Sequence, residues 1–254
     1  MCLIAWNWQP NSSTPLLLLA NRDEFYARPA SPLHWWKPAA NGAQVLAGKD
    51  LQGGGTWLGV SRTGRLAALT NFRSGEPQRS DTPSRGELVA TFLHSDRSAN
   101  DYLQQLAEHS SDYNPFNLLV FDGQQLMGLE SRRATVLTHA PGLGAVSNAN
   151  FNTPWPKLTQ LRLGLATQAT TNMAGLHTLL PLLHDPTIAP DAALPRTGVP
   201  LALERVLSSA FITTPGYGTR ACSVLALHHS RAEFIEQSFG PRGLISETQE
   251  QFSF

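Results

Sequence analysis

The sequence predicts an α+β protein in which two antiparallel sheets are stacked and covered by helices. Strand-like segments lie at both ends of the chain, helix-like segments gather between them, and short turns join neighbouring strands as in antiparallel pairs. With 254 residues, of which 41% are hydrophobic, the chain is long enough to bury such a core. We expect one domain over residues 1–254, because no repeat or low-complexity linker divides the sequence.

The first expected element is a strand over residues 2–8, where apolar side chains nearly alternate. A turn-rich segment, residues 9–15, separates it from an apolar strand over residues 16–20, which predicts a hairpin. A second hairpin joins residues 56–62 to residues 65–71 through Thr63 and Gly64. The later expectations, in chain order, are a helix over 84–93 that opens on a capping-box pattern, a helix over 100–108, strands over 117–121, 125–130 and 134–137, helices over 155–167, 174–184 and 201–210, and a closing hairpin of 222–228 with 233–239.

Composition and charge argue against several kinds of partner. Lys and Arg together number 19, as do Asp and Glu, so the net charge is zero and no basic surface for nucleic acid is expected. The longest apolar run, residues 16–20, is too short to span a membrane, and no secretion signal opens the chain. Two cysteines form no disulfide framework, and the eight histidines lack metal-ligand spacing, so we expect a cytoplasmic protein without a metal site.

The first hairpin joins two fragments into one candidate site. A turn centred near residue 12 places Cys2 opposite Arg22, to within about two residues, and so beside the run Asn-Arg-Asp-Glu at residues 21–24. A guanidinium about 4 Å from a thiolate stabilises it by about 4 kcal/mol at an effective dielectric near 20, so we expect Arg22 to lower the pKa of the thiol. Asp23 and Glu24 would offset part of that effect.

Removal of Met1 would make Cys2 the first residue of the chain. Its α-amine, with a pKa near 8, would then be a general base attached to the nucleophile itself. Asp23 or Glu24 would hold that amine in place. In the alternative interpretation, Cys2 is a small buried hydrophobe and the run that follows Ala20 is a solvated strand end; both interpretations stay open here.

Four further stretches carry candidate residues. Asn71 and Asn148 each end a predicted strand, where a side-chain amide is able to donate to an oxyanion. Arg220 directly precedes the strand of the closing hairpin. The glycine run that includes Gly54 and Gly55 suits a tight backbone near a ligand, and no phosphate-binding fingerprint follows it.

The stretches "MCLIAW", "LLLLANRDEFYARP", "GGGTWLGVSRTGRLAALTNFR", "SRGELV" and "VSNANFNTPWPKL" resemble the NRDE-motif family, also called the transport and Golgi organisation protein family. The resemblance extends over nearly the whole chain. It implies an N-terminal-nucleophile (Ntn) hydrolase-like fold, a four-layer αββα sandwich. The nearest functional comparison that it suggests is the group of cholylglycine hydrolases and penicillin V acylases.

The site in that group consists of an N-terminal Cys, an Arg-x-x-Asp at the end of the second strand, two Asn residues and a late Arg. This sequence departs at the second position, where Asn21 and Glu24 fall with Arg22 and Asp23 between them. The expected catalytic residues are Cys2, Arg22, Asp23, Glu24, Asn71, Asn148 and Arg220. The expected ligand-binding residues are Asn21, Gly54, Gly55, Trp57 and Phe72.

Two functions therefore remain open, and a scaffold that binds no small ligand is a third alternative. In the first, Cys2 hydrolyses or transfers the acyl group of a small amide or thioester, with no cofactor required. In the second, the chain is a non-catalytic binding and trafficking protein for haem or for an acyl-type hydrophobic ligand, as links reported for the family suggest. Tryptophans such as Trp57 would then line the ligand pocket.

Overall fold

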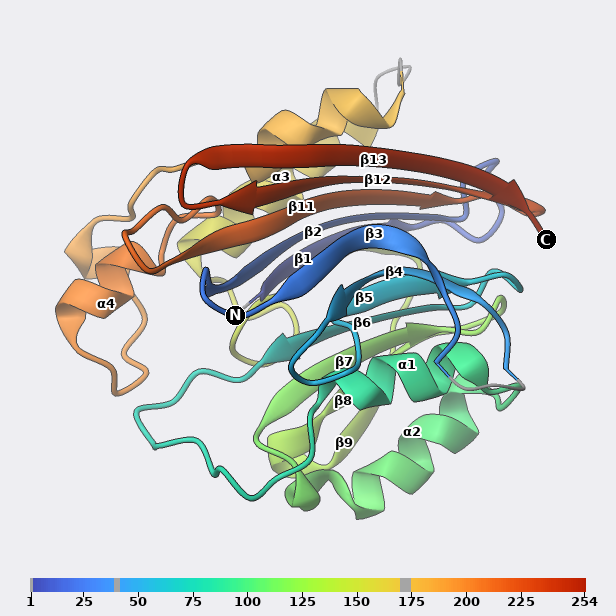
Figure 1. Cartoon of the computed structure of the whole chain (residues 1–254), viewed down its shortest axis with the longest axis horizontal. Coiled ribbons are helices and arrows are strands. Elements are labelled where there is room, and N and C mark those ends of the chain that lie inside the picture. Colours follow the sequence, from blue (N-terminus) through green and yellow to red (C-terminus); the bar gives the residue numbers. More distant parts are fainter. Residues whose placement is uncertain (1, 39–41, 170–174) are drawn as a thin grey trace.

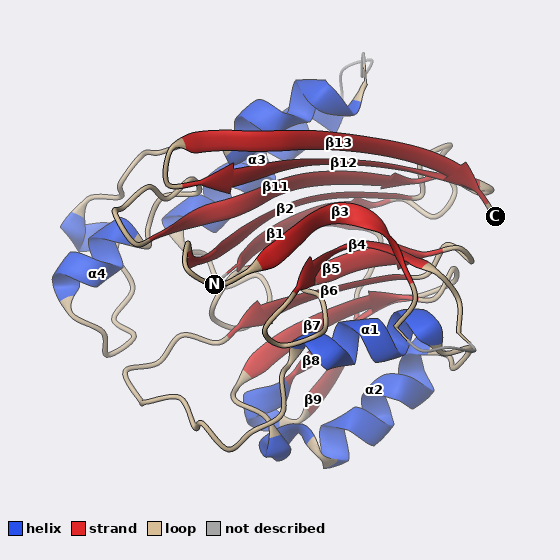
Figure 2. Ribbon diagram, in the orientation of Figure 1, coloured by secondary structure: helices blue, strands red, loops and turns tan. Residues whose placement is uncertain are grey.

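The computed structural model describes residues 2–38, 42–169 and 175–254 and shows two antiparallel sheets stacked face to face (Figure 1). Helices lie on the outer side of each sheet, so the layers run helix, sheet, sheet, helix (Figure 2). The predicted α+β class with two stacked antiparallel sheets is confirmed.

Sheet A brings together strands from both ends of the chain. Its order is β10-β1-β2-β11-β12-β13, and every neighbouring pair is antiparallel. The central position of β2 between β1 and β11 places the N-terminal hairpin beside the C-terminal one. The strands are β1 (Cys2–Trp8), β2 (Leu16–Phe25), β10 (Gly142–Val146), β11 (Tyr217–Leu227), β12 (Arg231–Gly240) and β13 (Gly243–Ser253).

Sheet B is a meander whose strands follow one another in chain order from β3 to β9. Short connections favour this arrangement, because each strand pairs with its neighbour in sequence. The strands are β3 (Ala30–Trp36), β4 (Val45–Asp50), β5 (Leu58–Ser61), β6 (Leu66–Asn71), β7 (Phe116–Phe121), β8 (Leu126–Glu130) and β9 (Thr135–Thr138).

Helices cover the two outer faces. α1 (Gly86–His94) and α2 (Ala99–Glu108) pack on sheet B, whereas α3 (Pro156–Ala169) and the 3₁₀ segment η3 (Leu176–Leu183) pack on sheet A. The remaining short segments are α4 (Leu201–Val206) and the 3₁₀ turns η1 (Ser110–Asp112), η2 (Ser131–Arg133) and η4 (Asp191–Ala193).

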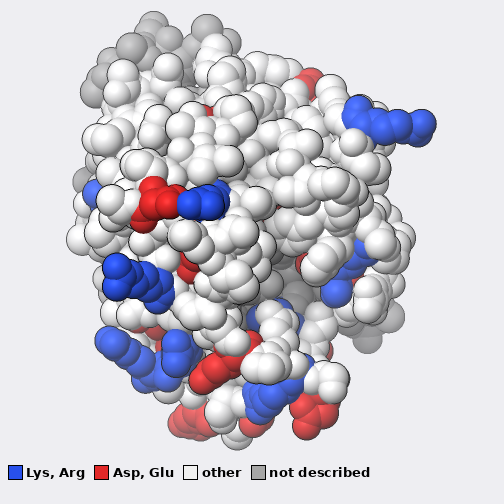
Figure 3. Space-filling view, turned by 90° about the vertical axis from the view of Figure 1, so that its left-hand side faces the viewer, with Lys and Arg blue, Asp and Glu red and all other residues white. Residues whose placement is uncertain are grey.

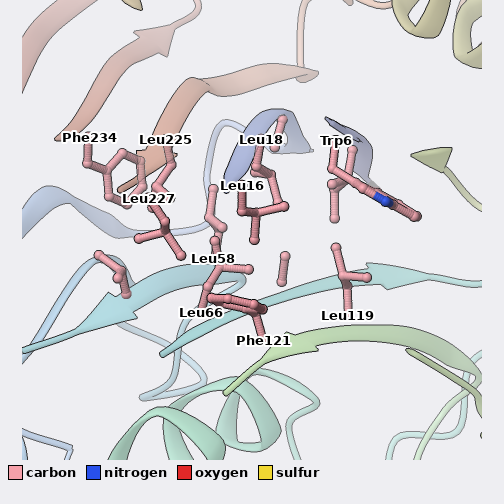
Figure 4. Close-up of a cluster of buried hydrophobic side chains, with 14 of the residues drawn as sticks. Trp6, Leu16, Leu18, Leu58, Leu66, Leu119, Phe121, Leu225, Leu227 and Phe234 are labelled. Atoms are coloured by element: carbon pink, nitrogen blue, oxygen red, sulfur yellow. The ribbon is translucent and has the colours of Figure 1, made fainter. Parts of the chain in front are cut away.

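Apolar side chains fill the space between the sheets. In Figure 4, Trp6, Leu16 and Leu18 from sheet A face Leu58 and Leu119 from sheet B. Intervening residues of the same strands face the outer helices, which explains why β2 begins with a continuous apolar run. A strand buried on both faces has no polar face to present to solvent.

Three expected helices differ in detail from the structure. α1 begins at Gly86, and its capping box does not form, because the Glu87 carboxylate accepts a hydrogen bond from the Tyr113 hydroxyl (2.6 Å) instead of capping the helix. The helix expected over 174–184 is the 3₁₀ segment η3, which contains Pro181; residue 174 lies outside the described residues. The helix expected over 201–210 ends at Val206.

Strands β3, β4, β10 and β13 were not expected from the sequence. β3 contains Pro32 and has a register shift between Ser31 and His34, which interrupts its alternating pattern. β13 is an edge strand, largely exposed and polar, so it lacks the apolar face that predicts a strand. The expected closing hairpin, β11 with β12, is therefore followed by a further strand.

Candidate active site

The register of the first hairpin is the one predicted. Cys2 pairs with Arg22 across β1 and β2, at the end of sheet A where the chain begins. The Cys2 side chain is buried and belongs to the apolar cluster between the sheets. This places the thiol at one end of the inter-sheet space.

The run at residues 21–24 does not form one surface, because consecutive residues of a strand point to opposite faces. Arg22 and Glu24 face the inter-sheet space with Cys2. Asn21, an expected ligand-binding residue, faces the outer layer, where its Nδ2 donates to the carbonyls of Leu183 (2.7 Å) and Ala210 (2.8 Å). The amide of Asn21 thus fixes η3 to sheet A.

Asp23 also lies on the outer face of β2 and is completely buried. Its Oδ1 accepts a hydrogen bond from the Thr219 hydroxyl at 2.8 Å, and its Oδ2 lies 4.0 Å from Lys157 Nζ. Lys157 lies in the first turn of α3 and was not identified in the sequence. Burial lowers the pKa of Lys157 to about 8, and the charge of Asp23 opposes that decrease only in part.

A carboxylate that the sequence did not reveal, Asp50, engages Arg22. Its Oδ2 lies 3.0 Å from Arg22 Nη2 and accepts a 2.6 Å hydrogen bond from Arg28 Nε. Glu24 lies near both arginines, at 4.0 and 3.9 Å. Burial alone would raise the pKa of Asp50. The pKa is lowered instead, because the hydrogen bonds from Arg28 and from the Gly53 N–H, together with the charges of Arg28 and Arg22, outweigh the effect of burial.

The glycine run holds Asp50 rather than forming a separate loop. The N–H of Gly53 donates to Asp50 Oδ1 at 2.8 Å, and Gly54 has a positive φ of 75°. A Cβ on Gly55 would lie 2.3 Å from the backbone of Gly86, so only glycine allows α1 to begin this close. Gly54 and Gly55 thus position the Asp50 turn and α1.

The thiol of Cys2 is not activated in this arrangement. Burial raises the pKa of Cys2, and the charge of Arg22 offsets that increase only in part. The sequence argument expected a lowered pKa; that expectation is wrong here chiefly because the thiol is buried, and the charges of Asp23 and Glu24 raise the pKa further.

The two asparagines expected near the thiol meet at the ends of their strands. Asn148 Nδ2 donates to the backbone carbonyl of Asn71 at 2.8 Å. Ser147 Oγ donates to the Cys2 carbonyl at 3.1 Å and lies 3.2 Å from Asn148 Oδ1. Cys2, Asn71 and Asn148 therefore lie at one end of the sandwich.

The other expected residues take different positions. Arg220 donates to backbone carbonyls and so secures the turn after β2; its acceptors are Phe25, Tyr26, Arg28 and Phe239. Phe72 lies under the guanidinium of Arg132, 4.8 Å from the ring centroid. Trp57 belongs to the same apolar cluster as Cys2 and lines a cavity with Arg22.

Asp50, Lys157 and Glu236 are ionisable residues of this region that the sequence analysis missed, as it missed Arg28, Ser147 and Thr219. A signal existed for Asp50, since an Asp followed at short range by glycines is typical of a side-chain-capped turn. Lys157 and Glu236 lie within amphipathic segments, and their sequence pattern does not distinguish them from surface charges. Among the described residues, no group of three or more His, Cys, Asp and Glu side chains is arranged to hold a metal ion.

The described helices are all too short or too polar to cross a bilayer. On the face drawn in Figure 3, acidic and basic side chains are intermixed, with no extended area of one sign.

The two stacked sheets with helices on their outer faces form an Ntn-hydrolase-like fold. A mutant conjugated bile acid hydrolase from Clostridium perfringens shares this fold, with a TM-score of 0.54 at 10% identity over 100% of this chain and 96% of that one. A variant of the same hydrolase gives a TM-score of 0.52. At this identity the likeness establishes the fold and not the activity.

The family model described as Transport and Golgi organisation 2 matches residues 1–241, and the chain belongs to this family. A Transport and Golgi organization protein 2 homolog from Bos taurus is 35% identical over 264 residues, which cover 94% of this chain and 93% of the relative. The Homo sapiens homolog is 32% identical and covers 96% of this chain and 95% of its own. The resemblance stated from the sequence is confirmed.

Proposed function

We propose that the chain is an Ntn-type cysteine hydrolase or acyltransferase that acts on a small amide or thioester. The observation that carries the proposal is the placement of Cys2 opposite Arg22, with Asn71 and Asn148 at the same end of an Ntn-hydrolase-like sandwich. A nucleophile, a nearby cation and two amide-bearing side chains are the components that acyl transfer requires.

Removal of Met1 is the activating step in this proposal. It would convert the Cys2 nitrogen from an amide into an amine with a pKa near 8, which is able to accept the thiol proton. The same ammonium charge, on the residue that carries the thiol, would stabilise the thiolate and oppose the effect of burial. Glu24 and Asp23, one on each face of β2, are the carboxylates proposed to orient the amine.

The reaction then follows from the groups present. Cys2 Sγ attacks the substrate carbonyl carbon while its proton passes to the α-amine. The side-chain amides of Asn71 and Asn148 donate to the oxyanion, and the leaving amine or thiol takes the proton back as the carbonyl re-forms. Water, or a second nucleophile, resolves the acyl-cysteine and regenerates the thiol.

The second candidate is a non-catalytic binding and trafficking protein for haem or an acyl-type hydrophobic ligand. The raised pKa of the thiol and the pairing of Arg22 with Asp50 favour it, since both weaken the nucleophile. Two cavities in the described part are each about 160 Å³, close to the volume of a cavity that holds one benzene molecule. Haem is much larger than either, so haem as cargo would need a binding surface outside these cavities.

The test combines intact mass with thiol labelling against pH, on protein isolated from its native cells. Cys222→Ser leaves Cys2 as the one thiol, so each labelling rate is assigned without ambiguity. Loss of Met1, a labelling pKa well below 8 and turnover of small thioesters that Cys2→Ala abolishes would support the enzyme. Retention of Met1 with a labelling pKa at or above 8.5 would exclude it.

The carrier is tested separately by haem titration. A shift of the Soret band that disappears in Trp57→Leu would support haem binding near the inter-sheet cavity. An unchanged Soret band over the whole titration would remove haem from the proposal.

A further inference from the structure

A cavity of about 160 Å³ lies between the two sheets, next to the candidate site. One wall comes from β3 and β4 of sheet B, and the other comes from β11 and β12 of sheet A. Arg22, the residue opposite Cys2, and Trp57, which shares the apolar cluster of Cys2, both line it. The cavity thus borders the candidate site at Arg22, and Cys2 is not among its lining residues.

Glu236 is the buried acid of this cavity, and it joins the two sheets. Its Oε1 accepts a hydrogen bond from the Leu33 N–H of β3 at 2.9 Å, and its Oε2 accepts one from Ser223 Oγ of β11 at 3.1 Å. A Cβ on Gly48 would lie 3.5 Å from Oε1, so the carboxyl group packs against backbone that has no side chain. The side chain is therefore held in one position.

Two cations that line the cavity already have partners. Arg22 is paired with Asp50 at 3.0 Å. The ammonium group of Lys49 lies 4.8 Å from the centroid of the Trp36 ring. The charge of Arg22 acts on Glu236 and partly offsets the effect of burial on its pKa, but neither cation forms an ion pair with Glu236.

The third cation, Arg220, is directed to backbone carbonyls rather than to a carboxylate. Among the described residues, no Lys, Arg or His nitrogen lies within the 4.0 Å that defines an ion pair with Glu236. A carboxylate that is buried without an ion-pair partner is stabilised by a cationic donor that enters the same space.

We propose that this cavity binds a primary amine carried on a body no larger than one six-membered ring, with the amine donating to the Glu236 carboxylate. The size limit follows from the volume, which matches a cavity that holds one benzene molecule. The apolar walls, which include Trp57, Phe239 and Ile245, would contact the ring. This proposal rests on the proposed function. Together they imply that the substrate is an amide or thioester whose small acyl group carries an amine.

The charge of Glu236 gives the proposal a pH dependence. Burial raises the pKa of Glu236 to about 7, so its ionised fraction rises about tenfold between pH 6 and pH 8. The charged groups that share the cavity with Glu236 are Arg22 from β2, Lys49 and Asp50 from β4, and Arg220 from β11. Cys222 of β11 lies on the outer face of the sheet but is close enough to be affected by the charge of Glu236. On β13 the residue paired with Glu236 is Thr248, which does not titrate. Because the pKa of Asp50 is lowered and that of Cys222 is raised well above its usual value, neither changes charge in this interval.

The test is calorimetric titration of the full chain with benzylamine, benzyl alcohol and benzoate, which share a ring and differ in charge. We expect benzylamine to bind at least tenfold more tightly than the other two at pH 8 and to lose about tenfold of its affinity at pH 6. A naphthylmethylamine should bind at least tenfold more weakly than benzylamine. Equal or tighter binding of benzoate, no dependence on pH, or no binding of any of these compounds would overturn the proposal.

Glu236→Gln should reduce benzylamine affinity to that of benzyl alcohol and remove its pH dependence. Glu233→Gln, on the same strand but facing His228 outside the cavity, is the matched control and should change neither. The ligand series on the unmodified chain is decisive even where Glu236→Gln does not fold. Cys2→Ala should keep benzylamine binding. If the unmodified chain binds benzylamine as expected but turns over no thioester, the proposed enzyme alone is refuted. If it turns over thioesters but does not prefer the amine, this inference alone is refuted.

Discussion

Replacing Asp50 with asparagine should destabilise the fold and release Arg22 toward the thiol. Asp50 pairs with Arg22 at 3.0 Å and with Arg28 at 2.6 Å, and its side chain is only 16% exposed. Breaking a buried pair by removing one partner costs about 3–5 kcal/mol, and Glu24, about 4 Å from each arginine, would recover part of it. We therefore expect Asp50→Asn to lower the free energy of unfolding by about 2–4 kcal/mol.

Urea denaturation measures this change, and a slope near 3 kcal/mol/M would convert it into a midpoint decrease of about 1 M. The pKa of Asp50 is lowered in the folded state, so its contribution is present above the unfolded value near 3.9 and is lost as the pH falls through the folded value. The difference between wild type and variant should accordingly shrink at the most acidic pH. In the Cys222→Ser background, labelling of Cys2 should begin at lower pH in the variant, because Arg22 has lost a counter-ion.

The matched control is Asp191→Asn, which alters an exposed Arg–Asp pair of similar length, 2.6 Å to Arg205. Solvent screens that pair, so its loss should leave the urea midpoint unchanged. If Asp50→Asn unfolds at the wild-type urea concentration and labels with the wild-type pH profile, the account of the Arg22 cluster is refuted.

Three further predictions concern the residues around this cluster. Asn148→Ala should lower kcat for a small thioester about 100-fold or more with little change in KM, because one oxyanion donor is lost; an unchanged kcat would remove Asn148 from the site. The wild-type protein should become more stable between pH 8 and pH 10, because the pKa of Lys157 is about 8 in the folded state and near 10.4 in the unfolded state, which therefore binds more protons in this interval. Lys157→Met should abolish this gain. Urea denaturation measures it, and parallel curves of stability against pH for wild type and variant would contradict the prediction. Gly55→Ala should destabilise by about 1–3 kcal/mol through contact with Gly86, and Gly54→Ala by about 1–2 kcal/mol through its positive φ; a urea midpoint unchanged in either variant would show that the turn adjusts.

Local patterns in the sequence were sufficient for the hairpin that builds the site. The turn between β1 and β2 fixes the register, and the register places Cys2 opposite Arg22. The sequence also allows the faces of the strand to be assigned. Neighbouring residues of a strand occupy opposite faces, so Asn21 and Asp23 face away from Arg22.

The partners of these side chains could not be predicted, because they depend on how the two sheets stack. Asp50 lies 28 residues from Arg22 in sequence and reaches it from the other sheet. Glu236 and Lys157 are buried by elements that pack against them from distant parts of the chain. The expectation of an activated thiol was wrong chiefly because it counted the charge of Arg22 without the burial of Cys2, which raises the pKa of the thiol.

Turnover of a small thioester by the native protein, compared with Cys2→Ala, tests the central claim most directly when the intact mass of each sample is recorded first. The account predicts a chain without Met1 that releases several thiol groups per molecule, and no release above background from Cys2→Ala. A chain that retains Met1, or equal rates for the two proteins, would contradict it.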